Sequence, residues 1–230
     1  MMLRDYIQKR QQMREQKDNF YTANGIHVYT KDQMVNDLVD LEGVVAELEA
    51  KLPDHIRDGV EMVIVGHFDE FDERGINAFY KDGALHVSNV QDDDEDLLDD
   101  LVHETAHSVE EQYGMEIYAD QKIKQEFVRK REHLYNVLWK MGFKAPKEMF
   151  ADCEYSQEFD EFLNQDVGYD KLSEILKGIM ISPYAATSLR EYFATAFTDF
   201  YLYPDSHGYL QRISPEVYKK LVELHQLDQA

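Results

Sequence analysis

Cysteine is nearly missing from this sequence of 230 residues. The single residue, Cys153, excludes a disulfide framework within the chain and a multi-cysteine zinc ribbon, and is compatible with a reducing cytosol. Long apolar runs are missing as well: none approaches the roughly 20 residues that cross a bilayer. The N-terminal stretch has no apolar segment of the kind found in secretory signals. We therefore expect a cytoplasmic protein that is not integral to a membrane.

Basic residues are also scarce. The chain has 24 lysines and arginines against 46 aspartates and glutamates, and its formal net charge is -22. Nucleic acids are bound by basic surfaces that neutralise phosphates, so we expect no nucleic-acid partner. Hydrophobic residues make up 43% of the chain and aromatic residues 12%, which is ample for a packed core. The composition predicts a folded globular protein.

No glycine- or serine-rich linker divides the sequence. The segment 3–19 is highly charged and ends before Asn24-Gly25, a turn signal, so we predict a charged N-terminal helix or arm over residues 1–24. Residues 25–230 are predicted to form a single domain. We interpret the helical, heavily charged stretch at about 117–178 as an insertion within that domain.

Apolar patterning after residue 25 predicts both strands and helices. Short apolar runs predict strands at 26–29 and 61–65, and Asp82-Gly83 predicts a hairpin that joins 78–80 to 84–88. Apolar residues at spacings of three and four predict the helices. These lie at 30–53, opened by a Thr30/Gln33 capping box, and at 97–114, 117–141, 169–176, 188–203 and 214–227. The pattern indicates a helix-rich α+β fold with a small sheet.

The clearest chemical signal is the run His103-Glu104-Thr105-Ala106-His107. In a helix, two imidazoles four residues apart lie on one face, one turn from each other, where both can reach a single ion. Glu104 projects from the adjacent edge of that face, close enough to accept a proton from a metal-bound water. Two ordinary surface histidines are the alternative, but the motif lies inside a predicted helix that follows a strand and a hairpin. This context favours a zinc site.

A third protein ligand must come from farther along the chain. Glu110 and Tyr113 stand where a metzincin has glycine and histidine, so that class of peptidase is excluded. Glu191 begins an otherwise aromatic helical stretch that should pack on the core, where a carboxylate needs a partner. Zinc would supply this partner, and pairing with Arg190 or another surface cation is the alternative. Glu126 is a second candidate ligand.

These motifs resemble those of the gluzincin metallopeptidases, the group that includes the catalytic domain of anthrax lethal factor and the Pro-Pro endopeptidases. In that family a His-Glu-x-x-His helix is followed by a glutamate ligand, often in a Glu-aromatic-Phe-Ala context, which matches Glu191-Tyr192-Phe193-Ala194. A tyrosine seven residues before the ligand contacts the transition state, and the matching residue is Tyr184. The resemblance covers roughly residues 60–200. The chain departs from it at Thr195, where family members often carry an acid.

The resemblance implies a zincin-like fold with a small mixed β-sheet and an active-site helix. It also implies a zinc-dependent endopeptidase that acts on a peptide or protein substrate. One Zn2+ per chain would be held by His103, His107 and Glu191, with Glu104 as general base and Tyr184 as electrophile. The alternative is a catalytically inactive zincin-fold structural or interaction protein. Intact Glu104 speaks against it, because an inactive descendant would more often have lost the base. A metal-dependent hydrolase with a non-peptide substrate is a third possibility.

Overall fold

The computed structural model describes residues 19–227 of the chain. It divides into two compact units, one that ends at Ser108 and one that begins at Val109, and the boundary falls within one long helix. The predicted charged helix at 3–19 lies, except for Asn19, outside the described residues. Among the helices that the structure describes, none is long and apolar enough to cross a membrane.

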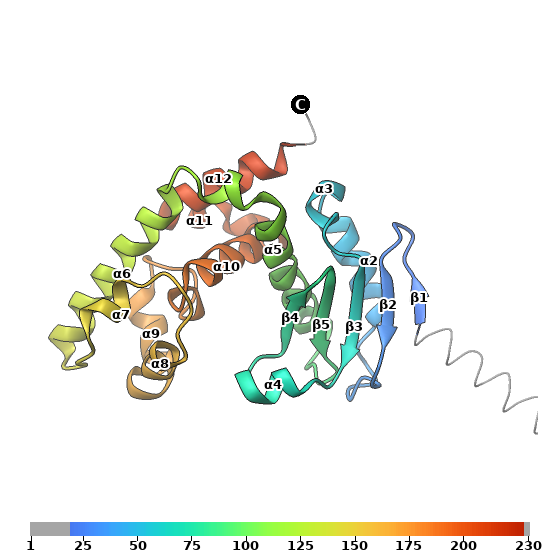
Figure 1. Cartoon of the computed structure of the whole chain (residues 1–230), viewed down its shortest axis with the longest axis horizontal. Coiled ribbons are helices and arrows are strands. Elements are labelled where there is room, and N and C mark those ends of the chain that lie inside the picture. The colour runs from blue at the N-terminus through green and yellow to red at the C-terminus, as the bar shows by residue number, and fades with distance from the viewer. Residues whose placement is uncertain (1–18, 228–230) are drawn as a thin grey trace, which may run out of the picture. The chain divides into compact units, whose positions relative to one another are not determined.

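The first unit is built on a five-stranded sheet in the order β1-β2-β3-β5-β4 (Figure 1). Its strands are β1 (Asn19–Tyr21), β2 (His27–Thr30), β3 (Met62–Gly66), β4 (Ala78–Lys81) and β5 (Ala84–Ser88). The three central strands β2, β3 and β5 are parallel, whereas β1 and β4 are antiparallel to their neighbours and form the two edges. The sheet is therefore small and mixed, and the α+β class expected from the sequence is confirmed.

One face of this sheet carries much of the core of the first unit. The register pairs Val28 with Val63 and Val63 with Leu85, and all three side chains are fully buried. Because alternate residues of a strand point to opposite faces, the three form one apolar row across the parallel strands. Around the sheet lie the helices α2 (Leu41–Lys51), α3 (Asp54–Arg57) and α4 (Asp69–Arg74) and the first part of α5 (Asp94–Tyr118).

The hairpin predicted at Asp82-Gly83 is confirmed. Both residues adopt positive φ, 49° at Asp82 and 81° at Gly83, as a two-residue turn with the twist of a hairpin requires. The helix predicted from Thr30, by contrast, begins only at Leu41. The backbone before it is used elsewhere, since the Val35 N–H donates to the Asn89 carbonyl at 2.8 Å. The apolar spacing continues through this loop, so it predicted a helix that begins too early.

The second unit is helical. After the end of α5 it contains α6 (Lys122–Met141), α7 (Lys147–Ala151), α8 (Gln157–Glu161), η1 (Phe162–Val167), α9 (Tyr169–Leu176), η2 (Tyr184–Ala186), α10 (Leu189–Leu202), η3 (Pro204–Ser206), α11 (His207–Ile213) and α12 (Pro215–His225). Most residues of α10 are buried, and this helix contacts α6, α11 and α12. The helices predicted at 169–176, 188–203 and 214–227 are confirmed to within two residues at each end.

The break predicted between the helices at 97–114 and 117–141 lies a few residues later than expected. α5 has a kink at Tyr113 but ends only at Tyr118, and α6 begins at Lys122 after Gln121, which adopts a left-handed φ of 61°. No glycine or proline marks the break after Tyr118, whereas Gly114 indicated an earlier end of the helix. Much of the stretch interpreted as an insertion shares the core of the second unit, because α6 packs against α10 and α12.

Candidate metal centre

The helix α5 presents the two histidines of the motif. Its first turn holds Asp94, Glu95 and Asp96, which suit the positive end of a helix dipole. Its apolar stripe is fully buried at Leu101, Val102 and Ala106, and this fixes the rotation of the helix. His103 and His107 consequently share a half-buried face, with ring centroids 5.3 Å apart and planes at 78°. The prediction that the motif lies inside a helix is confirmed.

Glu104 lies on the same helix and is only 8% exposed. Its neighbour Thr105 is fully buried, and the Thr105 hydroxyl donates to the Leu101 carbonyl at 2.7 Å. Glu104 is therefore held on a stretch of helix whose inner face is tightly packed. A carboxylate shielded from bulk water in this way interacts more strongly with a nearby ion or substrate than an exposed one.

Glu191 is held by the start of α10. Ser188 is the N-cap of this helix, and its hydroxyl accepts a hydrogen bond from the Glu191 N–H at 3.1 Å. This Ser-x-x-Glu spacing is the pattern of a capping box, which the sequence displays directly. Because the cap fixes the backbone of Glu191, local structure determines the point from which its side chain extends. Glu191 itself is half-buried.

The residue before Glu191 ties the start of α10 to the later part of α5. Arg190 Nε lies 3.1 Å from Glu110 Oε2, and the Glu110 side chain is almost fully buried. The Tyr118 hydroxyl donates to Glu110 Oε1. Burial, and then the adjacent Glu110 charge, raise the pKa of Tyr118 above its usual range, so Tyr118 remains a donor. Glu110, which occupies the position of the metzincin glycine, thus has a clear structural role of its own.

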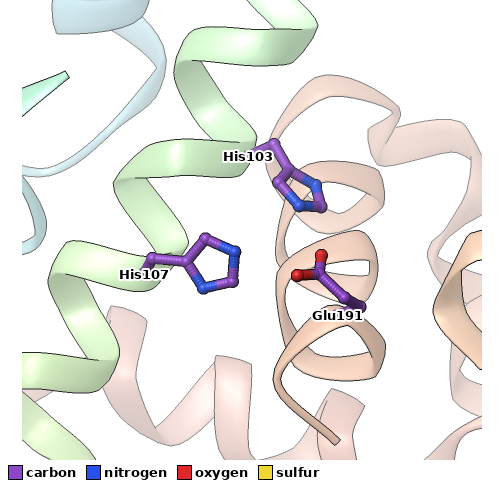
Figure 2. A group of neighbouring side chains, drawn as sticks. All are labelled: His103, His107 and Glu191. Carbon is purple, nitrogen blue, oxygen red and sulfur yellow. The ribbon is translucent and has the colours of Figure 1, made fainter. Parts of the chain in front are cut away.

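The three predicted ligands are brought together. His103, His107 and Glu191 each offer one ligand atom, and these atoms all lie within 4.8 Å of one another. Figure 2 shows the two imidazole rings, both from α5, and the carboxylate from α10 pointing toward one another. The second candidate ligand, Glu126, is engaged elsewhere. Its carboxylate accepts hydrogen bonds from the Tyr192 hydroxyl at 2.7 Å and from the Glu216 N–H at 2.9 Å.

The two aspartates one turn before the motif, Asp99 and Asp100, have raised pKa values. Burial raises the pKa of Asp100 to about 6, although a hydrogen bond from Gln91 Nε2 at 3.0 Å opposes the rise. Burial also raises the pKa of Asp99, and the charge of His103 acts in the opposite direction. Asp99 therefore lies within electrostatic reach of His103, whereas the Asp100 carboxylate accepts a hydrogen bond from Gln91.

Tyr184 opens the short helix η2 and is half-buried. Its carbonyl accepts hydrogen bonds from the Thr187 N–H at 3.0 Å and the Thr187 hydroxyl at 2.8 Å. This turn leads directly into the Ser188 cap of α10. Tyr184 and Glu191 are thus attached to one continuous, hydrogen-bonded backbone segment, and the role of the Tyr184 hydroxyl stays a prediction.

Arg131 belongs to this region, although no sequence pattern pointed to it. It is 1% exposed, and its Nη1 donates to the carbonyls of Ala186 at 2.8 Å and Thr187 at 3.1 Å. Its other Nη donates to the Met149 carbonyl, and the guanidinium lies 3.9 Å from the centroid of the Phe159 ring. Burial lowers the pKa of Arg131 to about 10, so it remains charged at neutral pH. A buried cation thus clamps the turn between Tyr184 and Glu191.

Comparison with known proteins adds no assignment. No protein-family model matches the chain, and neither a curated protein nor a solved structure matches it. The resemblance to gluzincins therefore rests on the motifs and on the side chains that the fold gathers.

Proposed function

We propose that the chain is a zinc-dependent endopeptidase with a zincin-like fold. The observation that carries this proposal is the grouping of His103, His107 and Glu191 within 4.8 Å. Two imidazoles and one carboxylate form a donor set that suits zinc. A tetrahedral ion with bonds of about 2.1 Å brings its ligand atoms to roughly 3.4 Å from one another, so modest side-chain rotations would close the set.

The number of ligands favours catalysis over a structural role for the metal. Structural zinc sites are closed by four protein ligands, whereas catalytic sites have three and keep one position open. Over residues 19–227, no fourth histidine, cysteine or acid joins this group. The count, together with the buried Glu104, supports an enzyme over an inactive zincin-fold structural or interaction protein.

The chain's own residues divide the chemistry of peptide hydrolysis between them. Zinc, when bound, would supply a Lewis acid for peptide hydrolysis. Glu104 would accept a proton, as general base, from the water that adds to the carbonyl carbon, and would then donate it to the amine that leaves when the C–N bond breaks. Tyr184 donates a hydrogen bond from its hydroxyl to the oxyanion that develops on the carbonyl. His103, His107 and Glu191 hold the metal.

The sheet also supports a peptide as substrate. Within residues 19–227, β4 pairs with β5 and forms one edge of the sheet. An extended peptide can pair with such an edge through main-chain hydrogen bonds. This arrangement binds a substrate chiefly by its backbone.

The test is a cleavage assay with zinc-loaded protein and a random peptide library, in which mass spectrometry detects new termini. We expect cleavage by the wild type, and a fall of about a thousandfold in kcat/KM for Glu104→Gln because the general base is lost. Zinc content should be unchanged in Glu104→Gln, which serves as its own control for folding of the site. Tyr184→Phe should lower kcat more than it changes KM. Cleavage that survives intact in Glu104→Gln would contradict the assignment of the base.

A further inference from the structure

The second unit has a second candidate site. Its lining contains none of the proposed metal ligands. A hollow of about 400 Å3 is lined by Glu126, Arg129, Lys130, His133, Gly178, Ile179, Arg212, Ile213 and Pro215. We call it the basic pocket. Three of its side chains are lysine or arginine, one is histidine and one is acidic, although aspartates and glutamates outnumber lysines and arginines by 46 to 24 in the chain. At physiological salt charges are screened over about 8 Å, so these nearby groups, and not the net charge, set the potential in the pocket.

Two arginines and one histidine form the rim of the basic pocket. Arg129, His133 and Arg212 are exposed, and none of them forms an ion pair with any residue in 19–227. Arg129 and His133 are four residues apart on α6 and therefore lie on one face of that helix. Arg129 is anchored through Nε, which donates to the Gln125 carbonyl at 3.1 Å. The ends of its guanidinium remain available to a ligand.

Arg212 is oriented by an aromatic ring on the other side of the pocket. Its guanidinium carbon lies 5.3 Å from the centroid of Tyr209. The Tyr209 hydroxyl in turn accepts a hydrogen bond at 2.9 Å from the N–H of Gly178, a lining residue with a positive φ of 80°. A guanidinium held over a fixed ring loses less conformational entropy on binding than a free one.

The floor of the basic pocket is arranged so that it does not repel an anion. Lys130 Nζ donates to the carbonyls of Ile179 and Ile213, both at 2.6 Å, and to Ser214 Oγ at 2.8 Å. These oxygens are therefore already bound to a cation. Burial lowers the pKa of Lys130 to about 8, which leaves it charged at pH 7. The carboxylate of the one acid, Glu126, accepts hydrogen bonds from the Tyr192 hydroxyl and from an N–H in the first turn of α12.

We infer that the basic pocket binds the phosphate group of a small molecule. A guanidinium group matches the oxygens of phosphate in a bidentate manner, which a lysine ammonium group cannot do. Ile179, Ile213 and Pro215 give the lining an apolar part, and the volume exceeds that of inorganic phosphate alone. A phosphomonoester, whose phosphate meets the arginines and whose organic part meets the apolar lining, therefore fits better than a bare ion.

The experiment is calorimetric titration of the full chain at pH 7 and constant ionic strength with inorganic phosphate, glycerol phosphate and acetate. We expect saturable binding, tighter for glycerol phosphate than for phosphate and weakest for acetate. Arg129→Gln and Arg212→Gln should each weaken binding by about tenfold, since each loses a charge-assisted hydrogen bond. Lys140→Gln removes an equal charge from an exposed position of α6 outside the pocket and should bind as the wild type does.

Phosphate could also bind a metal ion, so the titration is repeated with His103→Ala, which removes a proposed zinc ligand. Binding should persist in this variant, and its loss there would overturn the basic pocket as the site. The inference is also overturned if the wild type shows no saturable binding up to about 10 mM phosphomonoester. Unchanged affinity in the doubly substituted Arg129→Gln, Arg212→Gln chain, or preference for acetate, has the same consequence. None of these outcomes depends on peptidase activity.

Discussion

Single residues of the candidate centre differ in how readily the sequence revealed them. His103 and His107 are evident because a spacing of four residues places them on one helical face. Glu191 follows from the unusual position of a carboxylate in an aromatic helix. Arg131 carries no such signal. Its partners are main-chain carbonyls of two segments that are distant in the sequence, and no residue type or spacing marks a main-chain partner. Residues that act through the main chain of other segments are hidden until the fold is known.

The raised pKa of Asp100 predicts how stability depends on pH. The folded pKa of about 6 exceeds the unfolded value of 3.8, so the folded state binds more protons between these values. The contribution of Asp100 to stability is therefore present below pH 3.8 and is lost as the pH rises through 6. Asparagine does not ionise, so the free energy of unfolding of Asp100→Asn should rise relative to that of the wild type, by up to about 3 kcal/mol at pH 7.

Urea unfolding of the metal-free protein at a series of pH values measures this difference. An asparagine oxygen can still accept the hydrogen bond from Gln91 Nε2, so packing should change little. Exposed Asp92→Asn removes the same charge and is the control for net charge. If the free energies of unfolding of Asp100→Asn and the wild type differ by the same amount from pH 4 to pH 7, burial of Asp100 does not shift its pKa.

At the scale of elements, local signals predicted the fold wherever they were not competing with tertiary contacts. The turn at Asp82-Gly83 and the cap at Ser188 are set by neighbouring residues, and both lie where the sequence indicates. The start of α2 was missed, and the break after Tyr118 was expected at Gly114. In the first case the apolar spacing continues through a loop that is bonded to distant backbone, and in the second a non-glycine residue adopts a left-handed φ.

The clamp between α6 and the turn before α10 predicts that Arg131 positions Glu191. Arg131→Met removes the donors to Ala186, Thr187 and Met149, so the turn that leads to the ligand should loosen. Outer residues that orient metal ligands typically affect affinity by 10- to 100-fold, and we expect the zinc dissociation constant to rise by about tenfold. Competition with a chromophoric chelator measures it.

Phe159→Leu is the matched control for this prediction. It removes the ring that packs on the guanidinium but leaves the hydrogen bonds to the carbonyls in place. Both variants should lower the free energy of unfolding, whereas only Arg131→Met should weaken zinc binding. Equal zinc affinity in Arg131→Met and wild type, with both folded, would assign Arg131 to stability alone.

At the scale of the whole molecule, the sequence predicted the class of fold but not its arrangement. Helices and strands could be found from apolar spacing, and their proportions predict an α+β protein. The strand order β1-β2-β3-β5-β4 depends on long-range pairing that periodicity does not encode. The division into two compact units at Ser108 also falls inside a continuous helix, where no linker composition marks it. The prediction of a single domain over 25–230 stays a prediction.

The central claim is that His103, His107 and Glu191 hold a catalytic zinc ion, and metal content measures it most directly. Mass spectrometry would be applied to protein purified without added metal, with His103→Ala, Glu104→Ala and Glu191→Ala in parallel. We expect about one zinc per chain, lost in His103→Ala and Glu191→Ala and kept in Glu104→Ala. A metal-free wild type, or a Glu191→Ala chain that binds zinc as tightly as the wild type, would contradict it.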